Sequence, residues 1–117
     1  MKEIQITDGT TVIHAVLNRT VAAQDFEKRL PCTFSGSDSG MDYCCPAANG
    51  LYDPLETRRG WKNGDISLCG GWFALLYDGE EQSDEYGDMM IIGHIYDEDL
   101  PLVRQMPPRV TLKVETV

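Results

Sequence analysis

The stretch KEIQITDGTTVIHAVL, residues 2–17, carries the clearest structural signal in the chain. Residues 2–7 alternate apolar and polar side chains, residues 10–17 are rich in β-branched side chains, and Asp8-Gly9 stands between the two runs. Two apolar strands around Asp-Gly are the strongest short-range signal for a β-hairpin. This stretch therefore predicts a mainly β fold, and the rest of the chain agrees.

A helix is predicted directly after this hairpin. Thr20 can cap a helix that runs through about Leu30, because Ala22, Phe26 and Leu30 lie four residues apart and share one face. Pro31 then ends the helix.

Further strands are predicted over residues 32–35, 41–45, 66–69, 72–77 and 89–96, and one follows Pro107-Pro108. The first two of these flank a turn over residues 36–40, and a short second helix runs from near Pro101 to about Met106. About eight short strands with turn signals between them favour a closed barrel or a sandwich, and a barrel leaves no exposed sheet edge. With 117 residues and no linker, the chain is predicted to be one domain over residues 1–117.

Composition excludes several classes of protein. Apolar residues make up 42% and charged residues 25%, which is typical of a globular domain. The net charge of −9 repels phosphate backbones and anionic membrane surfaces, so neither nucleic acid nor a membrane is expected as a partner. No apolar run approaches a bilayer span, and the first residues contain no apolar secretion core.

The four cysteines form no metal or disulfide pattern. They are Cys32, Cys44, Cys45 and Cys69, without a CxxC pair and without a histidine at ligand spacing. We therefore expect four reduced thiols in a cytoplasmic protein, no metal and no cofactor.

Three other features are given structural interpretations. Residues 78–88 hold six acids and no base, but an EF-hand count places Ser83 where glycine is required, so a solvated loop is expected. His14 and His94 are each expected to pack among apolar neighbours on a strand face. Gly70-Gly71 precedes a strand rather than a helix, so it is predicted to mark a bulge or a barrel corner.

The best candidate for binding is the segment TRRGWK, residues 57–62. It holds three of the ten bases, and its tryptophan offers a stacking face. We predict that Arg58, Arg59, Trp61 and possibly Lys62 contact a carboxylate or phosphate group. The alternative is a solvated turn whose Trp61 packs on the barrel.

The order of elements is similar to that of the small bacterial cyclophilin-like domain family, over nearly the whole chain. The resemblance rests on the hairpin, residues 20–31, Gly64-Asp65-Ile66, residues 73–77 and Ile92-Gly93-His94-Ile95. It implies an eight-stranded β-barrel closed by two helices, with no established activity. His94 stands where the family usually carries a basic residue, and it is included among the candidate ligand contacts. The Phe-His-Arg strand of prolyl isomerases has no counterpart, so no catalytic residue is assigned.

The leading functional prediction is a non-catalytic binding module for a small anionic ligand or a peptide, as a monomer or homodimer. An eight-stranded barrel is filled by its own side chains, so the ligand is expected at a mouth or on a flank, beside residues 46–64. Two alternatives stay open: an enzyme with residual peptidyl-prolyl isomerase or thiol-dependent activity, and a homo-oligomeric structural protein.

Overall fold

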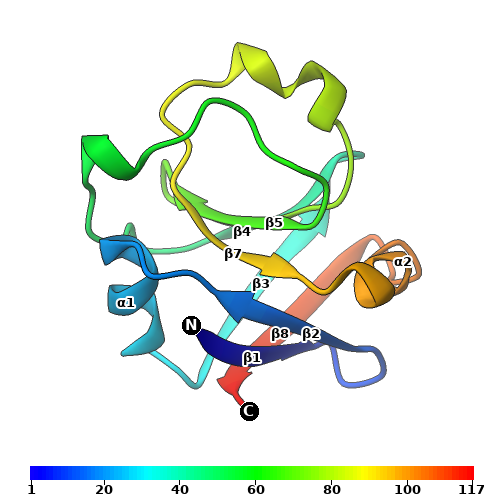
Figure 1. The fold of residues 1–117 in the computed structure, drawn as a ribbon. Helices are drawn as coiled ribbons and strands as arrows, with labels where there is room; N and C mark the ends of the chain where they lie inside the picture. Colours follow the sequence, from blue (N-terminus) through cyan, green and yellow to red (C-terminus); the bar gives the residue numbers. More distant parts are fainter.

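Eight antiparallel strands close into a barrel in the computed structural model, which describes residues 1–117 (Figure 1). The strands are β1 (Lys2–Thr7), β2 (Val12–Leu17), β3 (Cys32–Asp38), β4 (Asp42–Pro46), β5 (Asp65–Cys69), β6 (Trp72–Leu76), β7 (Ile91–Ile95) and β8 (Arg109–Thr116). Around the barrel their order is β1-β2-β7-β5-β6-β4-β3-β8, and β8 pairs with β1 to complete it. The predicted mainly β, closed eight-stranded barrel is confirmed.

Few helices accompany the barrel, and all are short. They are the α-helices α1 (Val21–Glu27) and α2 (Leu100–Val103) and the 3₁₀ helices η1 (Pro54–Glu56), η2 (Glu80–Glu85) and η3 (Asp97–Asp99). None is long and apolar enough to cross a lipid bilayer. The two long connections, residues 46–64 and 77–90, lie together on one side of the barrel, beside β4 and β5 (Figure 1).

The first hairpin forms as predicted. Asp8 Oδ1 accepts the backbone N–H groups of Thr10 and Thr11, at 2.9 and 2.7 Å. Because these bonds make Thr10 and Thr11 part of the turn, β2 starts at Val12 rather than at Thr10. Alternate residues of both strands, among them Ile4 and Ile13, are fully buried in the barrel.

Helix α1 begins where it was predicted and ends earlier. Thr20 is the N-cap, and its hydroxyl accepts the N–H of Ala23 at 3.1 Å. The helix ends at Glu27 rather than Leu30, because the last amides turn to the carbonyls three residues back and tighten the chain into a 3₁₀ turn. Leu30 still packs against the core.

The predicted turn over residues 36–40 was wrong in its first half. Strand β3 continues through Gly36 to Asp38, and the chain turns at residues 39–41. A side chain at position 36 would stand 2.0 Å from the carbonyl oxygen of Cys44, so glycine here allows two strands to approach closely rather than a turn.

Two further predictions need correction. Gly70 and Gly71, with φ of +63° and +85°, form the two-residue turn of the β5–β6 hairpin rather than a bulge or corner. The bulge lies in β7 instead, where Ile66 pairs with Gly93 and Ser67 with Ile91. The acidic segment, predicted to be a solvated loop, is exposed over most of its length, but residues 80–85 form η2.

Both histidines lie outside the core, contrary to the prediction that each packs among apolar neighbours. The side chain of His14 is 46% exposed, and Ile13 and Ala15, not Val12 and Val16, face inward. The bulge in β7 places Ile92 in the core and turns His94 outward, with 39% of its side chain exposed.

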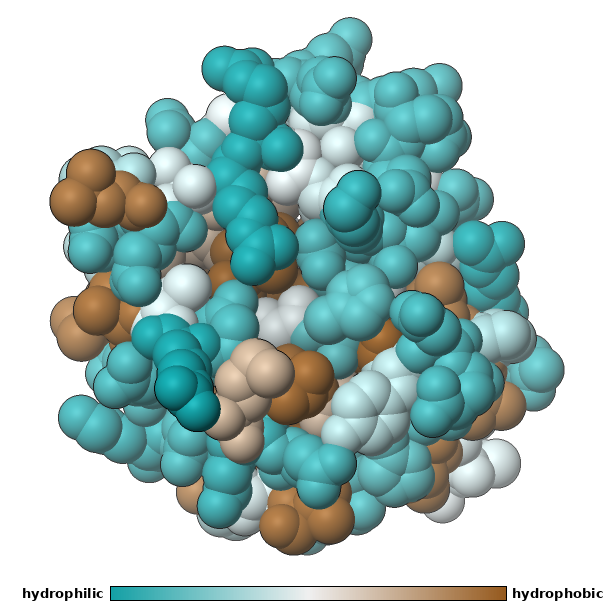
Figure 2. Space-filling model, viewed as in Figure 1, coloured by the Kyte–Doolittle hydropathy of each residue, from teal (hydrophilic) through white to brown (hydrophobic).

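The barrel interior is filled with side chains. Phe73 stacks between Phe26 of α1 and Phe34 of β3, with ring centroids 5.4 and 4.6 Å away. These rings belong to a single cluster of 23 buried residues and the half-buried residues packed on it. Figure 2 shows hydrophilic residues covering most of the visible face, with hydrophobic ones in small separate patches. The filled interior leaves a mouth or the outer wall of the barrel as places for a ligand.

Candidate functional site

A groove lies on the outer face of β4, β6 and β5, and we call it the outer groove. Its floor is a row of small side chains, because Cys44, Ala74 and Ser67 stand opposite one another in the registers of the three strands. Larger side chains stand in the next rows, Leu76 on one side and Trp72 on the other. Small residues between large ones leave a hollow of about 290 Å³.

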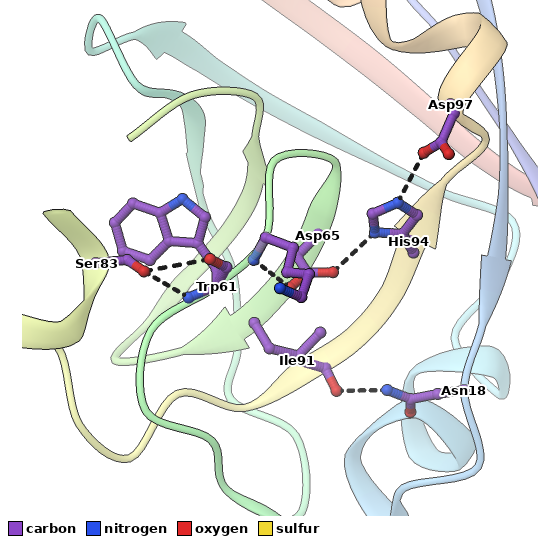
Figure 3. Close-up of polar contacts among 8 residues, drawn as sticks. Asn18, Trp61, Asp65, Ser83, Ile91, His94 and Asp97 are labelled. Carbon is purple, nitrogen blue, oxygen red and sulfur yellow. Dashed lines mark hydrogen bonds and ion pairs between the residues drawn. The ribbon is translucent and has the colours of Figure 1, made fainter. Parts of the chain in front are cut away.

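Aromatic side chains form the walls of the outer groove. Trp61 is 9% exposed, and its ring packs on that of Tyr86 with centroids 5.3 Å apart. Its indole N–H donates to the carbonyl of Asp78 at 3.0 Å. Its backbone N–H donates to Ser83 Oγ, also at 3.0 Å (Figure 3). This wall is held in place on two sides, whereas Trp72 is 48% exposed at the other end.

The predicted basic residues gather around a second hollow, of about 250 Å³, which shares Trp61 with the outer groove. We call the three basic residues Arg58, Arg59 and Lys62 the basic rim. All three are exposed, and none forms an ion pair. Arg59 Nη1 donates to the carbonyl of Asp84 at 2.9 Å. Three carboxylates line the same hollow, namely Asp65, Glu80 and Asp84.

His94 lies apart from most of this set. Its Nδ1 is 2.8 Å from Asp65 Oδ1, and its Nε2 is 3.3 Å from Asp97 Oδ1 (Figure 3). Asp65 is buried, and its other oxygen accepts the N–H of Lys62 at 2.8 Å. His94 borders a smaller hollow of about 100 Å³, which it shares with Arg58. Arg58 therefore connects His94 to the basic rim.

The four cysteines are free thiols, and two of them are poor nucleophiles. Burial, aided by the hydrogen bond that Cys44 donates to Asp42 Oδ2 at 2.9 Å, raises the pKa of Cys44 to about 12. Burial likewise raises the pKa of Cys45 to about 11. The thiolate is the reactive form, so these values disfavour thiol-dependent catalysis at neutral pH. No group of three or more His, Cys, Asp or Glu side chains is placed to hold a metal ion.

The basic rim was predicted from the sequence, and the outer groove was not. The alternation Trp72-Phe73-Ala74-Leu75-Leu76 contains a signal, since a small residue separates two large ones on the outward face. The hollow also needs Ser67 and Cys44 beside Ala74. Ser67 lies in the same hairpin as Ala74, but the register of Cys44 with Ala74 joins β4 and β6, which are not consecutive in the chain.

Comparison with known proteins adds a family and a fold. The model of the cyclophilin-like family matches residues 6–115. The hypothetical protein AF2241 from Archaeoglobus fulgidus superposes with a TM-score of 0.69 at 13% identity, covering 99% of this chain and 95% of that one. McbB, solved in complex with tryptophan, superposes with a TM-score of 0.67 at 14% identity, covering 98% of this chain and 44% of McbB. At such identities the likeness is one of fold alone. No curated protein matches the sequence.

Proposed function

We propose that this chain, which belongs to the cyclophilin-like family, is a non-catalytic binding module for a small molecule or a peptide. The observation that carries the proposal is the outer groove, where a floor of small residues lies between the walls of Trp61 and Trp72. The groove accommodates one flat apolar group. Apolar pockets with a few polar groups are the usual form of small-molecule sites.

The apolar contact alone supports weak binding. A ring that buries roughly 100 Å² of apolar surface gains about 2.5 kcal/mol, at about 25 cal/mol per Å². Association entropy opposes this gain, so the ring alone is expected to bind more weakly than about 10 mM. Tighter binding requires polar contacts around the groove.

The basic rim is proposed as the contact for an anionic group. Arg58, Arg59 and Lys62 are free of ion pairs, and Trp61 lines both this hollow and the outer groove. A carboxylate or phosphate held there forms charge-assisted bonds worth about 1.5–3 kcal/mol each. His94 borders the adjoining hollow and is retained as a peripheral contact.

Tryptophan is the first probe to test, because it combines a flat ring with a carboxylate and is bound by McbB, a protein of similar fold. Calorimetry would compare wild type with Ala74→Leu, which fills the floor of the groove. Ala48→Leu is the matched control, because Ala48 is exposed and lies outside the groove. We expect Ala74→Leu to weaken binding at least tenfold and Ala48→Leu to leave it unchanged.

A double variant, Arg58→Ala with Arg59→Ala, separates the basic rim from the groove. It is expected to weaken the binding of a carboxylate-bearing probe at least tenfold and to change the binding of an uncharged ring little. Equal binding to wild type and Ala74→Leu would exclude the groove as the site. Light scattering on the same samples tests the structural alternative: ligand-independent dimers broken by Trp72→Ala would show that a second copy covers the groove.

A further inference from the structure

We infer that the ligand of the outer groove carries a positive charge beside its flat apolar group, with Asp42 as the counter-ion. This inference rests on the proposed function, since it assigns the charge of the groove's ligand. Asp42 is the first residue of β4 and stands opposite Leu76, at the end of the row that borders the floor.

The carboxylate of Asp42 is held in place but has no cationic partner. Its Oδ1 accepts the hydroxyl of Ser39, and its Oδ2 accepts the thiol of Cys44. Both donors are neutral, and no Lys, Arg or His lies within ion-pair distance. A carboxylate has about four acceptor positions, so capacity remains for an ammonium group. Asp42 is half-buried, and an uncompensated charge there gains from pairing with a cation.

The rest of the groove also favours a cation. None of its lining residues is basic, and Asp42 is its one charged residue. Trp61, Trp72 and Tyr86 present aromatic rings, whose faces attract cations. After burial, the charge of Asp42 also contributes to the raised pKa values of Cys44 and Cys45.

An anionic group is disfavoured at the same place. It would lose its hydration and face both the carboxylate of Asp42 and the aromatic rings. The basic rim lies in a different hollow, so the charge assigned here to the groove is compatible with an anionic group held beside Arg58 and Arg59.

The experiment uses two probes that share one ring and differ in charge: tryptamine and 3-methylindole. Calorimetry on the full chain measures their affinities at low salt. We expect tryptamine to bind at least tenfold more tightly than 3-methylindole.

Asp42→Asn tests the counter-ion, because the amide keeps an oxygen that can accept the hydroxyl of Ser39. This variant is expected to bring the two affinities within about threefold of one another. Glu98→Gln is the control with the same change in net charge, since Glu98 is exposed, forms no ion pair and lies outside the groove. It should retain the preference for tryptamine. A thermal-unfolding curve for each variant shows that the comparison is between folded proteins.

The outcomes separate the two proposals. 3-Methylindole binding wild type as tightly as tryptamine, or a preference for tryptamine that survives Asp42→Asn, would overturn the inference and leave the groove as an apolar site. If Glu98→Gln also loses the preference for tryptamine, the preference comes from net charge, and the role of Asp42 is overturned. If no probe binds wild type, the proposed function fails, and the inference fails with it.

Discussion

Phe73→Ala should be among the most destabilising substitutions in the protein. Phe73 is fully buried, and it stacks on Phe26 and Phe34. Truncating a buried phenylalanine costs about 3–5 kcal/mol, and the hydrogen-bonded barrel wall limits collapse around the vacated space. Two ring pairs, each worth about 0.5–1.5 kcal/mol, are lost as well, so we expect a value in the upper part of that range.

Urea unfolding followed by tryptophan fluorescence measures this loss. Domains of this kind are stable by about 5–15 kcal/mol, so Phe73→Leu serves as a milder variant in case Phe73→Ala does not fold. A double-mutant cycle with Phe26→Leu should give a coupling of about 0.5–1.5 kcal/mol. Leu55→Ala is the control, since Leu55 is 92% exposed, and it should change stability by less than about 0.5 kcal/mol.

A loss below about 1.5 kcal/mol for Phe73→Ala, or an equal loss for Leu55→Ala, would refute the argument that the stacked rings fill and stabilise the barrel.

Two further predictions concern ionisable groups. The N–H groups of Thr11 and Thr10 hold the pKa of Asp8 below its usual value of 3.8. The carboxylate therefore stabilises the hairpin above that pH. This stabilisation is lost as the pH falls through the lowered pKa of the folded state. Asp8→Ala should therefore lower stability at pH 7, and its difference from wild type should shrink below about pH 4 in urea titrations, whereas a pH-independent difference would exclude the carboxylate's charge as the cause. The raised pKa values of Cys44 and Cys45, about 12 and 11, predict that iodoacetamide at pH 8 labels these two thiols slowly in the folded protein. Unfolding without reductant should then give four labels by mass spectrometry, and two labels would reveal a disulfide.

Local patterns in the sequence predicted local structure well. Asp8 capping the hairpin and Thr20 capping α1 each act within three residues, so a short stretch of sequence contains all the partners. The role of Gly36 depends on the carbonyl of Cys44 in the neighbouring strand. Such a contact arises only when the strands are in register, and the periodicity of one strand does not show it.

The histidines illustrate a second limit. Strand β2 is apolar on both faces, so its sequence does not tell whether Ile13 or His14 faces inward. In β7 the bulge shifts the alternation of inward and outward side chains after Ile92. That shift depends on the pairing with β5.

The candidate site was predictable only where its residues are contiguous. Arg58, Arg59 and Lys62 stand together in the sequence, and the structure keeps them around one hollow. The acids that share this hollow come from separate segments, and so do the residues of the outer groove. The floor residues of the outer groove meet because of the strand order β4-β6-β5, which is fixed by the whole barrel.

The pairing of β1 with β8 has a consequence for how the chain folds. Gln5 and Glu115 are joined by a hydrogen bond of 2.8 Å although 110 positions separate them, and the two chain ends lie on neighbouring strands. A contact so distant along the chain is entropically expensive to form early, so this seam should close late in folding. Joining the ends by a short linker and opening the chain within residues 46–64 would make the seam a local hairpin. Such a circular permutant should keep the barrel and fold faster.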